Sequence, residues 1–481
     1  MNFGLIIRYV GLVMLLNAAF MLVSAGVSLI NGVDTGFYPL LLSFLITAIV
    51  GAFPLIFVPN SHHLSTKESY VVVTMAWGLS CLLGMLPYLI WGGEFTLTNA
   101  WFESTSGFTT TGSTILRDVE ALPDGLLFWR ASTHWIGGIG VILFAIAILP
   151  AMGRTKMSLT SVEMSTMAKD NFRYATKKVL RIIIFVYVGL TLCETLVLRA
   201  VGMPWFDAVT NSFSTIATGG FCIKNESIMY YHSPTIEIVI TLFMILAGMH
   251  MGLIYATLRG QRNNIFRSEV ARFYLLSLVI CTLIVTVGLL VNHNYSTVGD
   301  ALRYGAFQVV SHITTTGFAS ASDALWPPLA MLVLMFCTMQ CAMAGSSTGG
   351  LKSDRILLLF KAIRARVLKL QHPNAVIRIK QNGVAQDDSV VNAAILLVVI
   401  YLLSALGGTI LLAAMNIDLL TGFTATIASL SNVGPGFGEV SNLDNYGALP
   451  GAAKWLLTVL MLFGRLEFFG FIHIFMLRSW K

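Results

Sequence analysis

Long apolar runs separated by short polar connections dominate the chain. Runs of about 20 apolar residues cross a lipid bilayer as helices, because a helix pairs every backbone amide within the lipid. The pattern predicts ten such spans, and we therefore expect an all-α polytopic membrane protein. The expected spans cover residues 5–31, 37–58, 70–92, 124–150, 180–203, 235–258, 271–292, 326–344 continuing past 351, 391–415 and 452–478.

Four further segments are too short to span a bilayer. Each is half apolar, stands between two full spans and ends in Thr, Ser and Gly, which predicts a half-helix that returns as extended chain. Such non-helical backbone is tolerated in a membrane only where it is buried in protein or lines a watery path. The segments are 97–110, 204–217, 299–315 and 418–432, and their helix-start signals are Thr98 and Asn99, Pro204, Asp300 and Asp418.

The ends of the four segments repeat one another. They read FESTSGFTTTGST (Phe102–Thr114), NSFSTIATGGF (Asn211–Phe221), VVSHITTTGFAS (Val309–Ser320) and ATIASLSNVGPGFG (Ala425–Gly438). Aligned on Gly112, Gly219, Gly317 and Gly434, they recur at intervals of 107, 98 and 117 residues. An alternative is that Gly and Thr only serve helix packing, but packing motifs lie within full spans and not between them.

The spacing divides the chain into four units of span, half-helix and span around one central pore. Two extra N-terminal transmembrane helices occupy residues 1–60. The four pseudo-repeats then cover residues 61–178, 179–268, 269–385 and 386–481.

Four such loops meeting at one axis predict a site for a monovalent cation. Extended backbone presents carbonyl oxygens, Gly permits the backbone angles that aim them inward, and Thr adds a hydroxyl. No carboxylate lies in the Thr/Gly stretches, and divalent ions generally require one. The predicted ligands of this cation are Thr110, Thr111, Gly112, Ala217, Thr218, Gly219, Thr315, Thr316, Gly317, Asn432, Val433 and Gly434. No organic cofactor is expected.

The second span of the third repeat is interrupted by small residues. We expect a blocking intramembrane loop there, and the alternative is a tight helix-packing seam or a kink. The loop residues are Gly345, Ser346, Ser347, Thr348, Gly349 and Gly350. Arg465 lies within the last span, where a charge is costly, and we expect it to hold this loop through carbonyl oxygens. Pairing of Arg465 with Glu467 is the alternative.

Composition and charge agree with a membrane protein. Hydrophobic residues make up 56% of the chain and charged residues 11%, which is too little charge for a soluble surface. Basic residues gather in Arg154–Arg181, Arg259–Arg272 and Lys352–Lys380, between spans, which predicts cytoplasmic loops and a cytoplasmic N-terminus and not a nucleic-acid site. The segments Arg154–Arg181 and Lys352–Lys380 would dock a partner protein or anionic lipid.

Acidic residues on the opposite side have two interpretations. They either concentrate cations at the entrance or only cap helices and keep loops soluble. They include Glu103, Asp118, Glu120, Asp207, Asp300 and Glu439.

The motifs resemble the TrkH/KtrB superfamily of potassium transporters, in particular its TrkH branch. They are HWIGGIG (His134–Gly140), TTTG (Thr109–Gly112), STIATGGF (Ser214–Phe221), TTTGF (Thr314–Phe318) and NVGPGFG (Asn432–Gly438). The resemblance implies potassium uptake across a bacterial cell inner membrane and a homodimer with one pore per subunit. It also implies a gating arginine at Arg465, a flexible loop at residues 345–350, and cytosolic nucleotide-binding subunits of the TrkA type.

Two other function classes remain to be weighed. An alternating-access, ion-coupled solute symporter typically shows two repeats and a charged midplane site, whereas this chain shows four repeats with neutral loops. An enzyme needs a nucleophile, a base or metal ligands that converge. The nine His residues are scattered, and we expect His134 and His312 to be structural, so no enzymatic activity is predicted.

Overall fold

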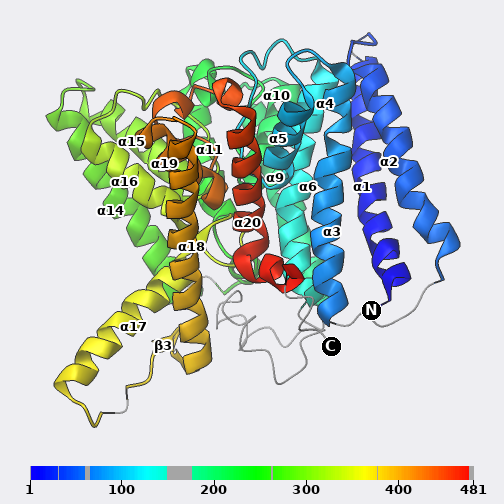
Figure 1. Ribbon diagram of the computed structural model, residues 1–481. Coiled ribbons are helices and arrows are strands. Elements are labelled where there is room, and N and C mark those ends of the chain that lie inside the picture. The colour runs from blue at the N-terminus through cyan, green and yellow to red at the C-terminus, as the bar shows by residue number, and fades with distance from the viewer. Residues whose placement is uncertain are drawn as a thin grey trace.

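The computed structural model describes residues 2–30, 32–59, 66–148, 176–261, 264–375 and 377–475. The chain forms a bundle of helices that run roughly parallel, with α1 and α2 at one edge (Figure 1). Most of the basic segment Arg154–Arg181 lies outside the described residues, as do His62 and His63.

All ten predicted spans are present as helices. Six of the helices in the described part of the chain are long and apolar enough to cross a membrane, and α6 and α20, of 25 residues each, are also long enough. The helices at the predicted spans are α1 (Phe3–Ile30), α2 (Phe37–Phe57), α3 (Thr66–Gly84) with α4 (Leu86–Trp91), α6 (Asp124–Ile148), α9 (Thr176–Ala200), α11 (Pro234–Ala247) with α12 (Met251–Leu258), α14 (Glu269–Val291), α16 (Pro328–Met339), α18 (Asp388–Ala414) and α20 (Gly451–Phe475). Helix α17 (Ser353–Gln371) follows α16 after the interruption.

One span predicted as continuous is broken. The chain bends by 104° between α11 and α12, so the expectation of an unbroken helix over 235–258 is wrong. Gly248 ends α11, and His250 caps α12 by accepting a hydrogen bond from Gly252 N at 2.9 Å. The break falls inside an apolar run, which is why hydropathy alone does not reveal it.

The four half-helices are present at the predicted places. They are α5 (Leu97–Phe108), α10 (Trp205–Ile216), α15 (Val298–Ile313) and α19 (Leu419–Ser431). Pro204 and Asp418 stand at the N-caps as predicted. The other two N-caps are Thr96, two residues before Thr98, and Thr297, three residues before Asp300. Asp300 completes the third cap from within the helix, because Thr297 Oγ1 donates to it at 2.6 Å.

The four repeats close into a ring. Each half-helix packs between the two spans of its own repeat and also against the second span of the preceding repeat: α10 against α6, α15 against α11, and α19 against α16. The ring closes because α5 of the first repeat packs against α20 of the last. Helices α1 and α2 stand outside this ring and pack mainly on each other, with α1 also touching α3 and α6.

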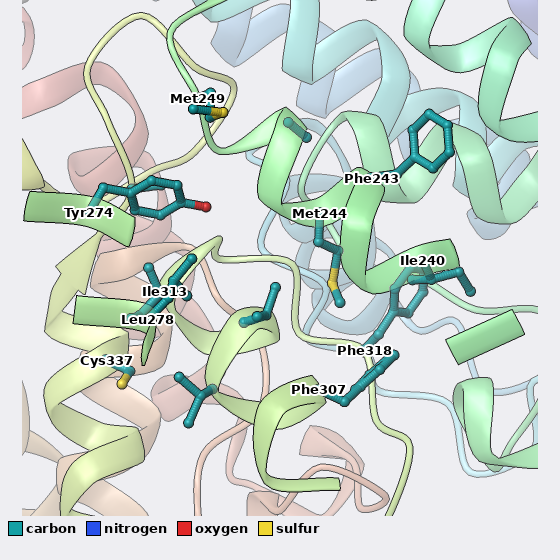
Figure 2. Close-up of a cluster of buried hydrophobic side chains, with 14 of the residues drawn as sticks. Ile240, Phe243, Met244, Met249, Tyr274, Leu278, Phe307, Ile313, Phe318 and Cys337 are labelled. Carbon is teal, nitrogen blue, oxygen red and sulfur yellow. The ribbon is translucent and has the colours of Figure 1, made fainter. Parts of the chain in front are cut away.

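Two large apolar cores hold the ring together. One joins repeats 2 and 3, where Ile240 and Met244 of α11 lie beside Phe307 of α15 and Phe318 (Figure 2). The other joins repeats 4 and 1. The outward faces of α1, α2, α14 and α18 expose many large aliphatic side chains, as expected of helices that face lipid.

Outside the bundle and the half-helices, the structure has one projecting helix and several short elements. Helix α17 extends away from the bundle, on the side where both labelled chain ends lie (Figure 1). The short elements are η2 (Ser227–Tyr231), α13 (Asn264–Arg267), β1 (Gln340–Cys341), β2 (Leu351–Lys352), β3 (Lys380–Gln381), β4 (Val384–Ala385), η3 (Gly438–Val440) and η4 (Tyr446–Ala448).

Candidate functional site: a ring of return strands above an intramembrane loop

The four half-helices end in the same backbone conformation. Each passes into a return strand through a non-glycine residue with positive φ: Thr110 (50°), Thr218 (55°), Thr315 (55°) and Asn432 (56°). Non-glycine residues rarely adopt this backbone conformation outside turns and functional sites. Two residues later stands a glycine with positive φ: Gly112 (82°), Gly220 (81°), Gly317 (76°) and Gly434 (99°).

These angles correct the alignment of the second repeat by one residue. Gly220, not Gly219, is the counterpart of Gly112, Gly317 and Gly434. The backbone hydrogen bonds agree, because the residue before each of these glycines donates to the carbonyl five positions earlier at 2.9 Å. The donors are Thr111, Gly219, Thr316 and Val433. The second triplet is therefore Thr218, Gly219 and Gly220, and Ala217 corresponds to Thr109 at the end of its helix.

The four return strands touch one another in cyclic order. A Cβ atom placed on any of the four glycines would lie closer than 3.0 Å to a backbone carbonyl oxygen of the adjacent strand. The pairs are Gly112 with the oxygen of Gly219, Gly220 with that of Thr316, Gly317 with that of Val433, and Gly434 with that of Thr111. The four oxygens belong to equivalent residues, so they form one ring, and only glycine leaves room beside them.

The ring is uncharged. Its strands offer backbone carbonyls, Thr hydroxyls and the Asn432 amide, and the Thr side chains and Asn432 are buried. Thr110 Oγ1 and Asn432 Oδ1 have no hydrogen-bond partner among the described residues. No group of three or more His, Cys, Asp or Glu that could hold a metal ion occurs in the described part of the chain. The arrangement supplies neutral oxygen donors that face one another around the ring.

A small cavity opens on one side of the ring. It holds about 110 Å³, and all four glycines (Gly112, Gly220, Gly317 and Gly434) contribute to its lining. Arg117, Lys224 and Asp444 stand among its other lining residues. The glycines of four repeats therefore meet at one place in the molecule.

The interrupted span forms a buried loop on the opposite side of the ring. Helix α16 ends at Met339, and strands β1 and β2 pair in parallel, with Gln340 opposite Leu351. This two-residue ladder closes the base of residues 342–350, a feature that small-residue content alone does not predict. Ser346, Ser347 and Thr348 are all buried.

The loop contacts the ends of three half-helices. Ser347 Oγ donates to the carbonyl of Ile216, at the end of α10, at 2.8 Å. Gly349 N donates to Thr315 Oγ1 at 3.4 Å, and Gly349 leaves no room for a Cβ beside Asn432. The loop thus lies directly against the first residues of the return strands in repeats 3 and 4.

The loop also contacts the break between α11 and α12. Met343 N donates to the carbonyl of Gly248 at 3.1 Å, and Met251 N donates to that of Gly345 at 3.2 Å. Gly345, with φ of 78°, packs against the His250 ring. Two broken spans therefore meet below the ring.

Arg465 reaches this loop from α20. The side chain is buried, Nη1 donates to the carbonyl of Ser347 at 2.6 Å, and Nη2 donates to the carbonyl of Gly137 in α6 at 3.1 Å. The hydrogen bond expected from Arg465 to a loop carbonyl is therefore present. The Glu467 side chain lies outside the described residues.

Several acidic residues expected in outer loops serve local structure. Glu103 is fully buried and pairs with Arg130 at 2.8 Å, and Asp207 accepts a hydrogen bond from Tyr231. Asp118 remains exposed, and the Asn225 amide that donates to it at 2.9 Å holds the pKa of its carboxyl below the usual value. Sequence reasoning missed Arg130, although it lies within a predicted span and so carries the same signal that singled out Arg465.

The two histidines beside the ring pack against aromatic residues. His134 stacks on Phe221, with 4.2 Å between ring centroids, and His312 accepts or donates a hydrogen bond with Thr338 at 2.8 Å. The His312 ring also stacks on that of Phe437, with 6.4 Å between centroids, so both imidazole rings lie against aromatic residues that follow a ring glycine.

Comparison with known proteins agrees with this architecture. The family of TrkH cation transport proteins matches residues 40–479. The potassium uptake protein TrkH of the Trk system from Salmonella typhimurium is 36% identical over the full length of both chains, and that from Halomonas elongata is 33% identical, also over the full length of both. The crystal structure of the potassium transporter TrkH from Vibrio parahaemolyticus superposes with a TM-score of 0.89 at 32% identity, covering 98% of each chain.

The match extends over the ring, the interrupted span and the two N-terminal helices alike, since it leaves almost none of either chain uncovered. The chain therefore belongs to the TrkH family of cation transport proteins.

Proposed function

We propose that this protein takes up potassium by conducting it through the ring of return strands. The observation that carries the proposal is the cyclic contact between each glycine and a carbonyl oxygen of the adjacent strand. Such a ring replaces the water shell of a dehydrated monovalent cation with neutral oxygens. Rubidium, and sodium to a smaller extent, would follow the same path. The full-length relatives are named as potassium uptake proteins, which supports potassium as the permeant ion.

The twelve residues predicted from the sequence are proposed as the filter, with Gly220 added by the corrected alignment. The half-helices support this role, because each directs its C-terminal end, which carries partial negative charge, toward the ring. The carbonyl oxygens of Thr111, Gly219, Thr316 and Val433 are the proposed ligands of one ion layer. The hydroxyls of Thr110, Thr218 and Thr315 would line the path below it, with Asn432 in the equivalent position of repeat 4.

Residues 345–350 and Arg465 are proposed as the gate. The loop lies against Thr315 and Asn432 and so would close the path just below the ring. Arg465 holds the loop through Ser347 and places a cation beside the path, which would repel a permeating ion. Movement of the loop, with release of the Arg465 hydrogen bond, would open it.

We propose further that the chain works as a homodimer with one pore per subunit in a bacterial inner membrane. Cytosolic nucleotide-binding subunits of the TrkA type would regulate it, since the relatives are named as members of the Trk system. The segment Lys352–Lys380, which includes the projecting α17, is the described surface that such a partner would contact. The chain ends on that side would then be cytoplasmic.

Ion uptake into liposomes that hold the purified protein tests the proposal. We expect rapid rubidium uptake, slower sodium uptake, and currents in single-channel recordings. Slow uptake that is strictly coupled to a second solute would instead support an alternating-access symporter. That result would contradict conduction through the ring.

A further inference from the structure

One buried ion pair next to the ring has no part in the proposed conduction path. Glu103 of α5 is fully buried, and Arg130 of α6 is 2% exposed. The Arg130 Nε donates to Glu103 Oε1 at 2.9 Å, and Nη2 lies 2.8 Å from the same oxygen. Burying two charges costs several kcal/mol per ion before pairing, so such a pair is weak evidence for stability and calls for another explanation.

Glu103 holds the return strand of its own repeat. Its carboxylate accepts hydrogen bonds from Thr114 Oγ1 at 2.9 Å and from Ile115 N at 3.0 Å. Thr114 and Ile115 stand two and three residues beyond Gly112. The position and orientation of this strand beside the ring therefore depend on Glu103.

The other repeats show the same device without charge. Nine residues before each ring glycine stand Glu103, Asn211, Gln308 and Ala425. Asn211 accepts from Cys222 Sγ at 3.5 Å, and Gln308 donates to the carbonyl of Ala321 at 3.0 Å. In repeat 4 the neighbouring Thr424 replaces the Ala and accepts from Phe437 N at 2.9 Å. Each half-helix thus fastens its own return strand, and at this position only repeat 1 carries a carboxylate.

Arg130 extends this fastening to the next repeat. Its Nη1 donates to the carbonyl of Cys222 at 3.2 Å, and its guanidinium carbon lies 4.0 Å above the Phe221 ring. Phe221 and Cys222 directly follow Gly220. The planar guanidinium therefore joins the return strands of repeats 1 and 2 through several contacts that an ammonium group cannot make together.

We propose that Glu103 and Arg130 are positioning residues that set the selectivity of the ring by fixing the return strand of repeat 1 against that of repeat 2. The inference rests on the proposed conduction through the ring. The contact between Gly112 and the Gly219 oxygen lies at this junction. If the strand is freed there, one side of the ring widens. Sodium uptake then rises relative to the uptake of rubidium and potassium.

The test measures rubidium and sodium uptake by the purified protein in liposomes. Glu103→Gln keeps the shape but turns an amide donor toward the guanidinium, and we expect it to lower the rubidium-to-sodium ratio by roughly tenfold. Arg130→Lys keeps the charge without the planar fork, and a smaller fall in the same ratio is expected. If Glu103→Gln does not yield monodisperse protein, Arg130→Lys alone tests the proposal.

A matched control comes from another ion pair in the same protein. Arg303 of α15 pairs with Glu237 of α11 and likewise joins a half-helix to a span, but neither residue bonds to a return strand in the described part of the chain. Glu237→Gln should leave the uptake ratio unchanged. An equal fall in this control would show a general loss of structure and overturn the proposal.

Gly112→Ser separates this proposal from the function on which it rests. If Gly112→Ser lowers the ratio and the Glu103 and Arg130 variants do not, the ring stands and the positioning role is refuted. If none of the three changes the ratio, conduction through the ring is refuted and the positioning role with it. A fall in all three, with Glu237→Gln unchanged, is the expected result.

Discussion

At the scale of single residues, the ring depends on glycines that leave no room for a side chain. Each has positive φ and lies against a carbonyl oxygen of the adjacent strand. The sequence motif identified three of these glycines directly. In the second repeat two glycines are adjacent, and the motif alone does not tell which one has the required backbone angle. Backbone geometry selects Gly220.

The corrected alignment predicts unequal effects for two neighbouring substitutions. Gly220→Ala adds a Cβ at positive φ against the backbone oxygen of Thr316, so we expect loss of most of the discrimination between potassium and sodium. In Gly219→Ala the atoms nearest to the added Cβ belong to the His134 side chain and not to a backbone carbonyl, so a smaller loss is expected. Permeability ratios of the two variants check this order, and the reverse order would restore the original alignment.

Buried charges show where sequence reasoning stopped. A charged residue within a predicted span singled out Arg465, and the hydrogen bond from it to Ser347 is present. The same rule applies to Arg130. Glu103 was instead expected among the acidic residues of the outer side, and nothing in the sequence pairs the two across 27 residues. Pairing between spans depends on helix packing, which a single sequence does not report.

At the scale of elements, the half-helices could be predicted because length and context both identify them. They are too short to span and stand between full spans, and all four are present. The break between α11 and α12 could not be predicted, because Gly248 and Met249 continue an apolar run. What stabilises the break is tertiary: the Gly248 carbonyl accepts a hydrogen bond from the intramembrane loop.

Removal of the arginine that holds the loop should open the path. Arg465→Ala deletes hydrogen bonds from a charged donor to two buried carbonyls, each worth about 1.5–3 kcal/mol, so we expect roughly a tenfold or greater rise in rubidium uptake. The ratio of rubidium to sodium should not change, because the ring is untouched. Unchanged or reduced uptake in liposomes would count against the gate.

A charge-matched control is available on the same helix. Lys454 of α20 is also buried and donates to Asn99 and to the carbonyl of Gly447, far from the loop in sequence. Lys454→Ala removes a cation from α20 without freeing the loop. It should therefore not raise rubidium uptake.

The loop's own backbone gives a second test at this scale. Gly345→Ala adds a Cβ at φ of 78° against the His250 ring, so the closed position of the loop becomes strained and uptake should rise several-fold. Gly383→Ala is the control, because Gly383 has φ of 79° with nothing within 4 Å of the added Cβ. Equal uptake by the two variants, both at the wild-type level, would show that the loop does not limit the flux.

At the scale of the whole molecule, four unequal repeats produce one closed ring. Closure follows from the packing of α5 of the first repeat against α20 of the last, so the chain needs no second subunit to complete the ring. The repeat count and the order of elements could be read from the Thr/Gly motifs and their spacing. The contacts that select one strand alignment from several, including the β1–β2 ladder, required the structure.

The account depends most on a cation occupying the centre of this ring, and anomalous diffraction from crystals grown in rubidium tests it most directly. We predict an anomalous peak on the ring axis, within ligand distance of the carbonyl oxygens of Thr111, Gly219, Thr316 and Val433. A well-ordered ring without such a peak, or rubidium bound only elsewhere in the protein, would contradict the account.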